Sequence, residues 1–255
     1  MTAVSFKDHF SKQAADYAKF RPRYPQQLFN YLGKIAPTRQ LAWDCGTGSG
    51  QAAIGLASVF DRVVGTDASE RQIANAQRHK RVEYRVALAE QSGLESSCID
   101  LTMVAQALHW FDLDRFYAEA RRVLKPSGVL AVSAYLLAQI EPAIDAVVNR
   151  FYSEVVGPFW PPERKLVENF NQVPFPFREI APPKFELTAH WNLDGLVGYL
   201  STWSASQRFI ESKGSDPVEQ IIAELRAAWS DPRQTRKIRW PLTLRIGLKG
   251  FEQSA

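Results

Sequence analysis

The sequence predicts an α/β fold built on a doubly wound, seven-stranded, mostly parallel sheet with an antiparallel edge. Three observations support this fold class. Short apolar runs alternate with helical patterns from residue 41 onward, a glycine-rich turn follows the first run, and the last two apolar runs follow a proline-rich break. With 255 residues, the chain is long enough to bury one large core.

Five short runs of apolar and β-branched residues predict the parallel strands, at residues 41–43, 63–66, 82–86, 101–104 and 129–133. The helices between them have recognisable ends. Ser69 stands three residues before Gln72, the spacing of a capping box, which predicts a helix from 69 to about 79. Asp112 can cap the next helix, and the Lys-Pro-Ser-Gly segment at 125–128 ends that helix before the fifth strand.

After residue 135 the alternation of strands and helices stops. Residues 136–156 have a helical pattern, and seven prolines between positions 158 and 183 break up the chain that follows. Residues 185–191 and 242–248 alternate like strands, with helices expected at 193–202 and from Asp216. The expected divisions are a helical cap over 1–40, a ligand-binding core over 41–135, a mainly helical insertion or substrate lid over 136–184, and completion of the sheet over 185–255.

Composition and charge exclude several classes of protein. No stretch approaches the roughly 18 uninterrupted apolar residues of a membrane span, and the first 20 residues lack the pattern of a secretory signal. Cys45 and Cys98 stand in no zinc-binding pattern, so no metal is expected. The net charge of +4 is not gathered into the basic stripe of a nucleic-acid binder. We therefore expect a cytoplasmic monomer or homodimer that binds neither nucleic acid nor membranes.

The segment from Asp44 to Gly50 reads Asp-Cys-Gly-Thr-Gly-Ser-Gly and joins the first strand to a helical run at 51–60. Glycines let a ligand approach the backbone closely, and the helix N-terminus favours anionic groups. A phosphate-binding P-loop is excluded because no lysine follows Gly50. The match to a dinucleotide-binding fingerprint is incomplete, since Gln51 stands where the third glycine should be, but this alternative stays open.

Two aspartates indicate which kind of ligand the glycine-rich turn binds. Asp44 would repel a pyrophosphate but could help to hold an ammonium group. Asp67 ends the second strand, 21 residues after Gly46, where its carboxylate can accept hydrogen bonds from both hydroxyls of a ribose. An amino-acid end, a ribose and an adenine together describe S-adenosylmethionine.

On these residues the chain resembles the class I S-adenosylmethionine-dependent methyltransferases, which have a Rossmann-like fold. The resemblance also covers Ala89-Glu90 and the turn at 125–128. A narrower resemblance, to the trans-aconitate methyltransferase-like (type 11) group, rests on the flanks of this core: Phe6, Phe10, Ala14, Tyr17, Arg21-Pro22, Tyr24-Pro25, the segment 106–111 and the segment 198–204.

The resemblance implies that the cofactor is S-adenosylmethionine and the product S-adenosylhomocysteine. It implies in-line methyl transfer to a small-molecule acceptor, at a carboxylate or hydroxyl oxygen. The two alternatives are an NAD(P)-dependent oxidoreductase and a non-catalytic S-adenosylmethionine-binding module. The cofactor-binding residues that we expect are Tyr17, Arg21, Asp44, Gly46, Thr47, Gly48, Gly50, Asp67, Ala68, Gln72, Ala89, Glu90 and Gln106.

Individual roles follow from the same resemblance. Arg21 would bind the methionine carboxylate, since a guanidinium binds a carboxylate in two-point geometry. Many relatives place an acid two residues before Glu90, where this chain has Leu88, so backbone N–H groups, Glu90 or apolar packing would recognise the adenine. Gln72 fits a structural role in the helix start and an adenine contact equally well.

The substrate pocket is expected to contain Tyr24, His109, Trp110, Trp160, Tyr199 and Trp203. His109 follows the fourth strand, at the edge where open α/β sheets bind ligands, and is the candidate catalytic residue. With a carboxylate acceptor it would act as an orienting donor. With an alcohol or phenol it could accept the proton, and an unperturbed pKa near 6.5 would give the rate profile an acid limb.

Overall fold

The computed structural model describes residues 20–250. The expected contact Tyr17 and about half of the expected N-terminal cap lie outside this range. In the described part of that segment, helix α2 (Gln26–Ile35) precedes the first strand and packs Leu28, Phe29 and Leu32 into the core.

The central sheet has the expected parallel half. Its order is β3-β2-β1-β4-β5, so the strand order reverses next to β1. The bounds are β1 Leu41–Cys45, β2 Arg62–Asp67, β3 Val82–Val86, β4 Ile99–Ala105 and β5 Leu124–Tyr135. The turn at 125–128, expected before the fifth strand, lies inside β5 as an irregularity: Ile99 pairs with Leu124, and Leu101 pairs with Val129.

The antiparallel edge has one strand more than expected, which makes the sheet eight-stranded rather than seven-stranded. Strand β8 (Arg236–Leu248) pairs with β5 on one side. On its other side it pairs with both β6 (Arg178–Ile180) and β7 (Phe185–Trp191). Pro182 and Pro183 separate these two strands, and proline has no N–H group for a ladder, so one edge strand is split in two.

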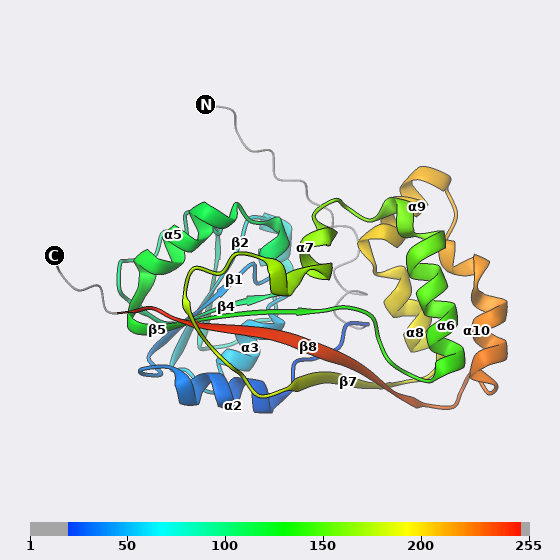
Figure 1. Cartoon of the computed structure of the whole chain (residues 1–255), viewed down its shortest axis with the longest axis horizontal. Helices are drawn as coiled ribbons and strands as arrows, with labels where there is room; N and C mark the ends of the chain where they lie inside the picture. Colours follow the sequence, from blue (N-terminus) through cyan, green and yellow to red (C-terminus); the bar gives the residue numbers. More distant parts are fainter. Residues whose placement is uncertain (1–19, 251–255) are drawn as a thin grey trace.

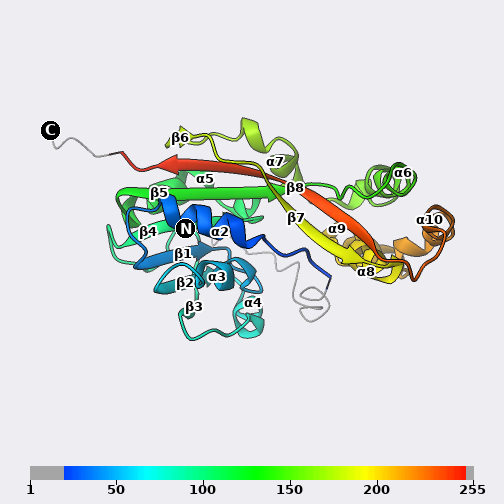
Figure 2. The same ribbon diagram turned by 90° about the horizontal axis from the view of Figure 1, so that it is seen from below.

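Helices cover both faces of the sheet. In Figures 1 and 2, α2 and α3 (Gln51–Leu56) lie on one face and α5 (Leu113–Val123) on the other. Helix α3 and helix α4 (Glu70–Asn75) are shorter than the expected 51–60 and 69–79. Helix α4 ends early because the backbone of Gln77 forms hydrogen bonds outside the helix. The Gln77 N–H donates to the Ser49 carbonyl, and the Gln77 carbonyl accepts from the Tyr84 hydroxyl.

A second, helical part lies beyond one end of the sheet (Figure 1). It contains α6 (Pro142–Arg150), a π-helical turn (Phe151–Val155), α8 (Leu193–Ser201), α9 (Ser204–Lys213) and α10 (Ile222–Trp229). Short helix α7 (Arg164–Glu168) lies between this part and α5. The expected helix at 136–156 begins only at Pro142, and α9 was not expected as a separate helix. The helical part therefore combines the insertion with the segment between β7 and β8.

Four single helical turns complete the described chain: Leu108–Trp110, Gly157–Phe159, Phe170–Gln172 and Pro217–Gln220. Asp216, expected to start a helix, caps the last of these turns, because its carboxylate accepts from the Val218 N–H at 2.9 Å. No helix between residues 20 and 250 has the length and apolar character to cross a membrane.

Asp100, at the start of β4, forms hydrogen bonds that connect three parts of the fold. It is fully buried and accepts hydrogen bonds from the N–H groups of Gln40 and Leu41, the Thr38 hydroxyl and the Lys125 ammonium. Burial opposes ionisation, but these donors outweigh it and lower the pKa of the Asp100 carboxyl. The carboxylate therefore holds the chain before β1 against β4 and β5.

Replacing Asp100 with Ala should destabilise the protein by about 3 kcal/mol, because it leaves two backbone N–H groups without this acceptor and removes the carboxylate paired with the Lys125 ammonium. Urea unfolding measures this change. Asp61→Ala, at an exposed position before β2, is the matched control and should change stability by about 0.5 kcal/mol or less. Equal stability of the two variants would contradict the structural role of Asp100.

Candidate active site

Two adjoining cavities form the candidate site. The larger one has a volume of about 190 Å³ and lies at the carboxyl ends of the parallel strands. Ligands of open α/β sheets bind at this edge, where the strand order reverses. The cavity is lined by ten of the expected cofactor contacts: Arg21, Gly46, Thr47, Gly48, Asp67, Ala68, Gln72, Ala89, Glu90 and Gln106.

The glycine-rich turn forms the floor of this cavity. Gly46, Gly48 and Gly50 have φ angles of 71°, 53° and 84°, a left-handed region that side chains disfavour. A Cβ atom on Gly46 would come within 2.6 Å of the Ala107 Cβ, and one on Gly50 within 2.2 Å of the Tyr84 hydroxyl. The loop thus packs closely on the segment that follows β4 and on β3. Gly48 has open space around it, on the cavity wall.

Asp67 lies at the end of β2 and connects the two loops of the cavity. Its Oδ2 accepts from the Gly48 N–H at 2.9 Å and its Oδ1 from the Ser69 N–H at 3.0 Å. Ser69 caps helix α4, because its hydroxyl accepts from the Gln72 N–H at 3.3 Å. This carboxylate therefore faces the cavity from a fixed position.

Asp44 lies beneath the loop rather than on the cavity wall. It is fully buried, and its Oδ2 accepts from the Thr47 hydroxyl at 2.5 Å. Burial raises the pKa of the Asp44 carboxyl to about 7, despite the opposing hydrogen bond from Thr47. Any influence of Asp44 on an ammonium group in the cavity would have to pass through the loop or a water molecule.

Cys45, the next residue, is buried in the core, and this burial raises the pKa of its thiol.

The loop after β3 lines the opposite side of the cavity. The Glu90 Oε1 accepts from the Asp112 N–H at 2.8 Å, so this side chain also secures the start of α5. Leu88 stands at the cavity with 46 % of its surface exposed. An exposed leucine beside a cavity offers an apolar surface to a flat ligand group.

These residues fit the S-adenosyl group that the sequence analysis expects. Gly48 leaves open space on the cavity wall, and Asp67 offers carboxylate oxygens at the end of β2. Arg21 contributes a cation on the wall, where one of its N–H groups donates to the Thr202 carbonyl at 2.9 Å and its Cζ lies 5.5 Å from the Tyr199 ring centroid.

A smaller cavity of about 60 Å³ adjoins the first. The two cavities share four residues of their walls: Arg21, Gln106, Trp110 and Tyr135. Gln106 has a φ of 57°, and its side-chain amide exchanges two hydrogen bonds with the backbone of Tyr135, which fixes the shared wall. The expected pocket residues His109, Trp160, Tyr199 and Trp203 line the smaller cavity, whereas Tyr24 lines the larger one.

His109 lines the smaller cavity next to Trp110, with ring centroids 4.6 Å apart. Burial, followed by the nearby charge of Arg164, lowers the pKa of His109 to about 3. The expectation of an unperturbed pKa near 6.5 for His109 is therefore wrong. The imidazole is neutral at physiological pH and is a weak base.

Several wall residues were missing from the expected site. Arg164, Leu136, Leu137 and Pro161 line the smaller cavity. No local motif indicates them, since their contact with the site comes from packing between distant segments. For Tyr135 a signal was present, because it ends the fifth strand at the ligand-binding edge of the sheet.

Gly50→Ala should destabilise the protein more than Gly48→Ala. Both changes strain a left-handed backbone, at a cost of about 1–2 kcal/mol, but only the first drives a methyl group into Tyr84. Thermal or urea unfolding measures the difference. Adding Tyr84→Phe should restore part of the loss in Gly50→Ala and none in Gly48→Ala. Equal losses without rescue would show that the close contact has no energetic role.

Comparison with known proteins agrees with this geometry. The family model described as a methyltransferase domain matches residues 43–132. A Dictyostelium discoideum protein named as a methyltransferase is 35 % identical over 89 % of this chain and 89 % of its own length. A Saccharomyces cerevisiae protein named as an S-adenosylmethionine-dependent methyltransferase is 28 % identical, over 49 % of this chain and 46 % of that protein.

A solved structure from Anaeromyxobacter dehalogenans, described as a type II methyltransferase, is 47 % identical. It superimposes with a TM-score of 0.85 and covers 91 % of this chain and 99 % of that one. The expected fold class and cofactor are confirmed, and the dehydrogenase alternative is set aside. The narrower likeness to the trans-aconitate group stays a prediction. This chain belongs to the class I S-adenosylmethionine-dependent methyltransferases.

Proposed function

We propose that the chain transfers the methyl group of S-adenosylmethionine to an oxygen atom of a small-molecule acceptor, a carboxylate or a hydroxyl. The observation that carries this proposal is the pair of adjoining cavities with a common wall. A cofactor in the larger cavity and a small acceptor in the smaller one would meet at Gln106, Trp110 and Tyr135. The smaller cavity offers room for a metabolite rather than a polymer.

The bound cofactor supplies a methyl group that its sulfonium already activates. The contribution of the chain is then alignment of the acceptor and exclusion of water. Residues 136–184 and the helices after β7 would act as the lid that excludes water. His109, neutral at physiological pH, can donate one hydrogen bond to an acceptor oxygen. A carboxylate arrives ionised and needs no base, which suits a histidine of such low basicity.

The proposal is tested by incubating the protein with methyl-labelled S-adenosylmethionine and a panel of small carboxylic acids, alcohols and amines. Labelled methyl esters or ethers are the expected products. An oligonucleotide and an unrelated protein serve as polymer substrates for comparison. Exclusive labelling of amines or polymers would overturn the choice of acceptor, and no labelling with any metabolite extract would favour a non-catalytic binding module.

Asp67→Ala should weaken S-adenosylhomocysteine binding at least tenfold, because a lost carboxylate acceptor for buried hydroxyls costs about 1.5–3 kcal/mol. Calorimetric titration measures the affinity. The variant also loses the acceptor for the Gly48 and Ser69 N–H groups, so Asp67→Asn provides a comparison that keeps the shape and one acceptor oxygen. Unchanged affinity in both variants would remove Asp67 from the cofactor site.

The transfer rate should show no ionisation near pH 6.5 that depends on His109. The pKa of His109 is lowered to about 3, so the side chain is deprotonated from pH 5 to 9 and its state does not change there. Rate profiles of the native chain and of His109→Gln should have the same shape, with a loss of about tenfold or less in the variant. An acid limb near pH 6.5 that disappears in His109→Gln would instead indicate base catalysis.

A further inference from the structure

The smaller cavity has aromatic walls. The ring centroids of Trp160 and Trp203 lie 5.5 Å apart, and Trp203 meets Tyr199 nearly at right angles at 5.6 Å. Trp110 stands on the wall that this cavity shares with the larger one. Indole and phenol rings give broad, flat contact surfaces, and they prefer to pack against another ring. The walls therefore favour an acceptor with a flat aromatic body.

The charges on the cavity wall are positive. Within residues 20–250, Arg21 and Arg164 line the smaller cavity, and no aspartate or glutamate does. His109 adds no charge, because burial and the Arg164 guanidinium hold its pKa near 3. A cavity lined by guanidinium groups and by no acid favours an anionic ligand.

Arg164 is held in place by aromatic residues rather than by an acid. Its Cζ lies 4.8 Å from the ring centroid of Trp160, and its Nε donates to the Tyr152 hydroxyl at 3.3 Å. In the described part of the chain, Arg164 forms no ion pair with a carboxylate. Glu168, one turn further along α7, instead accepts a hydrogen bond from Tyr152. The guanidinium is therefore oriented by an indole and a phenol, and it forms no direct pair with a described carboxylate.

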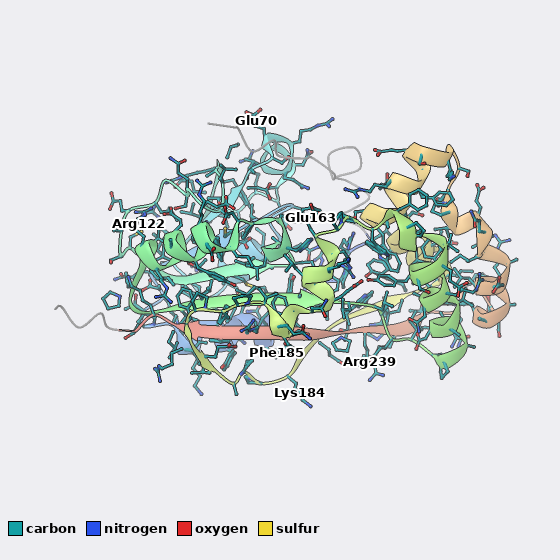
Figure 3. The ribbon with its side chains drawn as sticks, turned by 45° about the horizontal axis from the view of Figure 1, so that its top comes forward. Glu70, Arg122, Glu163, Lys184, Phe185 and Arg239 are labelled. Carbon is teal, nitrogen blue, oxygen red and sulfur yellow. The ribbon has the colours of Figure 1, made fainter. Side chains whose placement is uncertain are left out.

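The position of Arg164 places this charge away from the cofactor. Arg164 lines only the smaller cavity, whereas Arg21 lines both. The segment that carries it, marked by its neighbour Glu163, lies between the sheet and the helical part of the molecule (Figure 3). An anion bound to Arg164 would thus occupy the smaller cavity.

We propose that the acceptor is an aromatic carboxylic acid whose carboxylate binds Arg164 and whose ring lies against Trp160 and Trp203. The methyl-accepting oxygen then belongs to a second group on the ring, a carboxylate or a phenolate whose proton has passed to water, at the wall formed by Gln106 and Trp110. Its bond to the methyl carbon forms as the carbon–sulfur bond of S-adenosylmethionine breaks, and S-adenosylhomocysteine leaves. Arg164 determines specificity and takes no part in the transfer itself. This inference rests on the proposed function and adds to it the class of acceptor and the residue that selects it.

The test measures binding, so it does not depend on turnover. Calorimetric titrations are carried out with saturating S-adenosylhomocysteine and three probes. They are 4-hydroxybenzoate, 4-hydroxybenzyl alcohol, which lacks the charge, and trans-4-hydroxycyclohexanecarboxylate, which lacks the aromatic ring. The native chain should bind 4-hydroxybenzoate at least tenfold more tightly than either other probe, since a charge-assisted, two-point hydrogen bond and ring packing are each absent from one of them.

Arg164→Gln should lower the affinity for 4-hydroxybenzoate at least tenfold and leave the affinity for the alcohol unchanged, which also shows that the cavity is intact. Lys165→Gln is the matched control: it removes the same charge from the next residue, which is exposed and lines neither cavity. It should change neither affinity. Arg164→Lys keeps the charge without the planar fork and should restore part of the preference.

Three results would overturn the proposal. The first is equal binding of acid and alcohol by the native chain, or binding of neither. The second is an undiminished preference for the acid in Arg164→Gln. The third is formation of methyl benzoate from benzoate and S-adenosylmethionine, because the carboxylate would then lie at the transferred methyl group. Failure of S-adenosylhomocysteine itself to bind would count against the proposed function instead, so the two failures can be told apart.

Discussion

The site depends on the contact between the Asp67 carboxylate and the backbone N–H groups of Gly48 and Ser69. This carboxylate joins the glycine-rich turn after β1 to the start of the helix after β2. The two loops are therefore joined in the wall of the larger cavity. The three left-handed glycines make the contact possible, because side chains at Gly46 and Gly50 would strike Ala107 and Tyr84.

The two cavities draw their walls from different parts of the molecule. The loops at the carboxyl ends of the parallel strands build the larger cavity, whereas the smaller one also needs residues between 136 and 164 and the junction of α8 and α9. Gln106 and Tyr135 lie between them and fix each other through two hydrogen bonds. On the proposed function, the loops of the sheet bind the cofactor and the residues that the helical part adds select the acceptor.

Where the structure departs from the expected elements, contacts between distant segments overrode a local pattern. Helix α4 stops at Asn75 because the backbone of Gln77 is hydrogen-bonded to Ser49 and Tyr84. The edge of the sheet gains an eighth strand because β8 is long enough to pair with residues on both sides of Pro182 and Pro183. Ser49 and β8, the distant partners in these two cases, lie outside the window in which periodicity is judged.

The sequence by itself determined the strand–turn–helix units, the glycine loop and the acid at Asp67, because turn and capping preferences act over a few residues and leave a readable spacing. It also indicated several of the aromatic pocket residues through resemblance to a family. Only the tertiary structure brought Arg164 into the smaller cavity, placed Asp44 beneath the loop and lowered the pKa of His109. These properties arise from burial and from charges on segments far apart in the chain, and residue type and spacing carry no record of either.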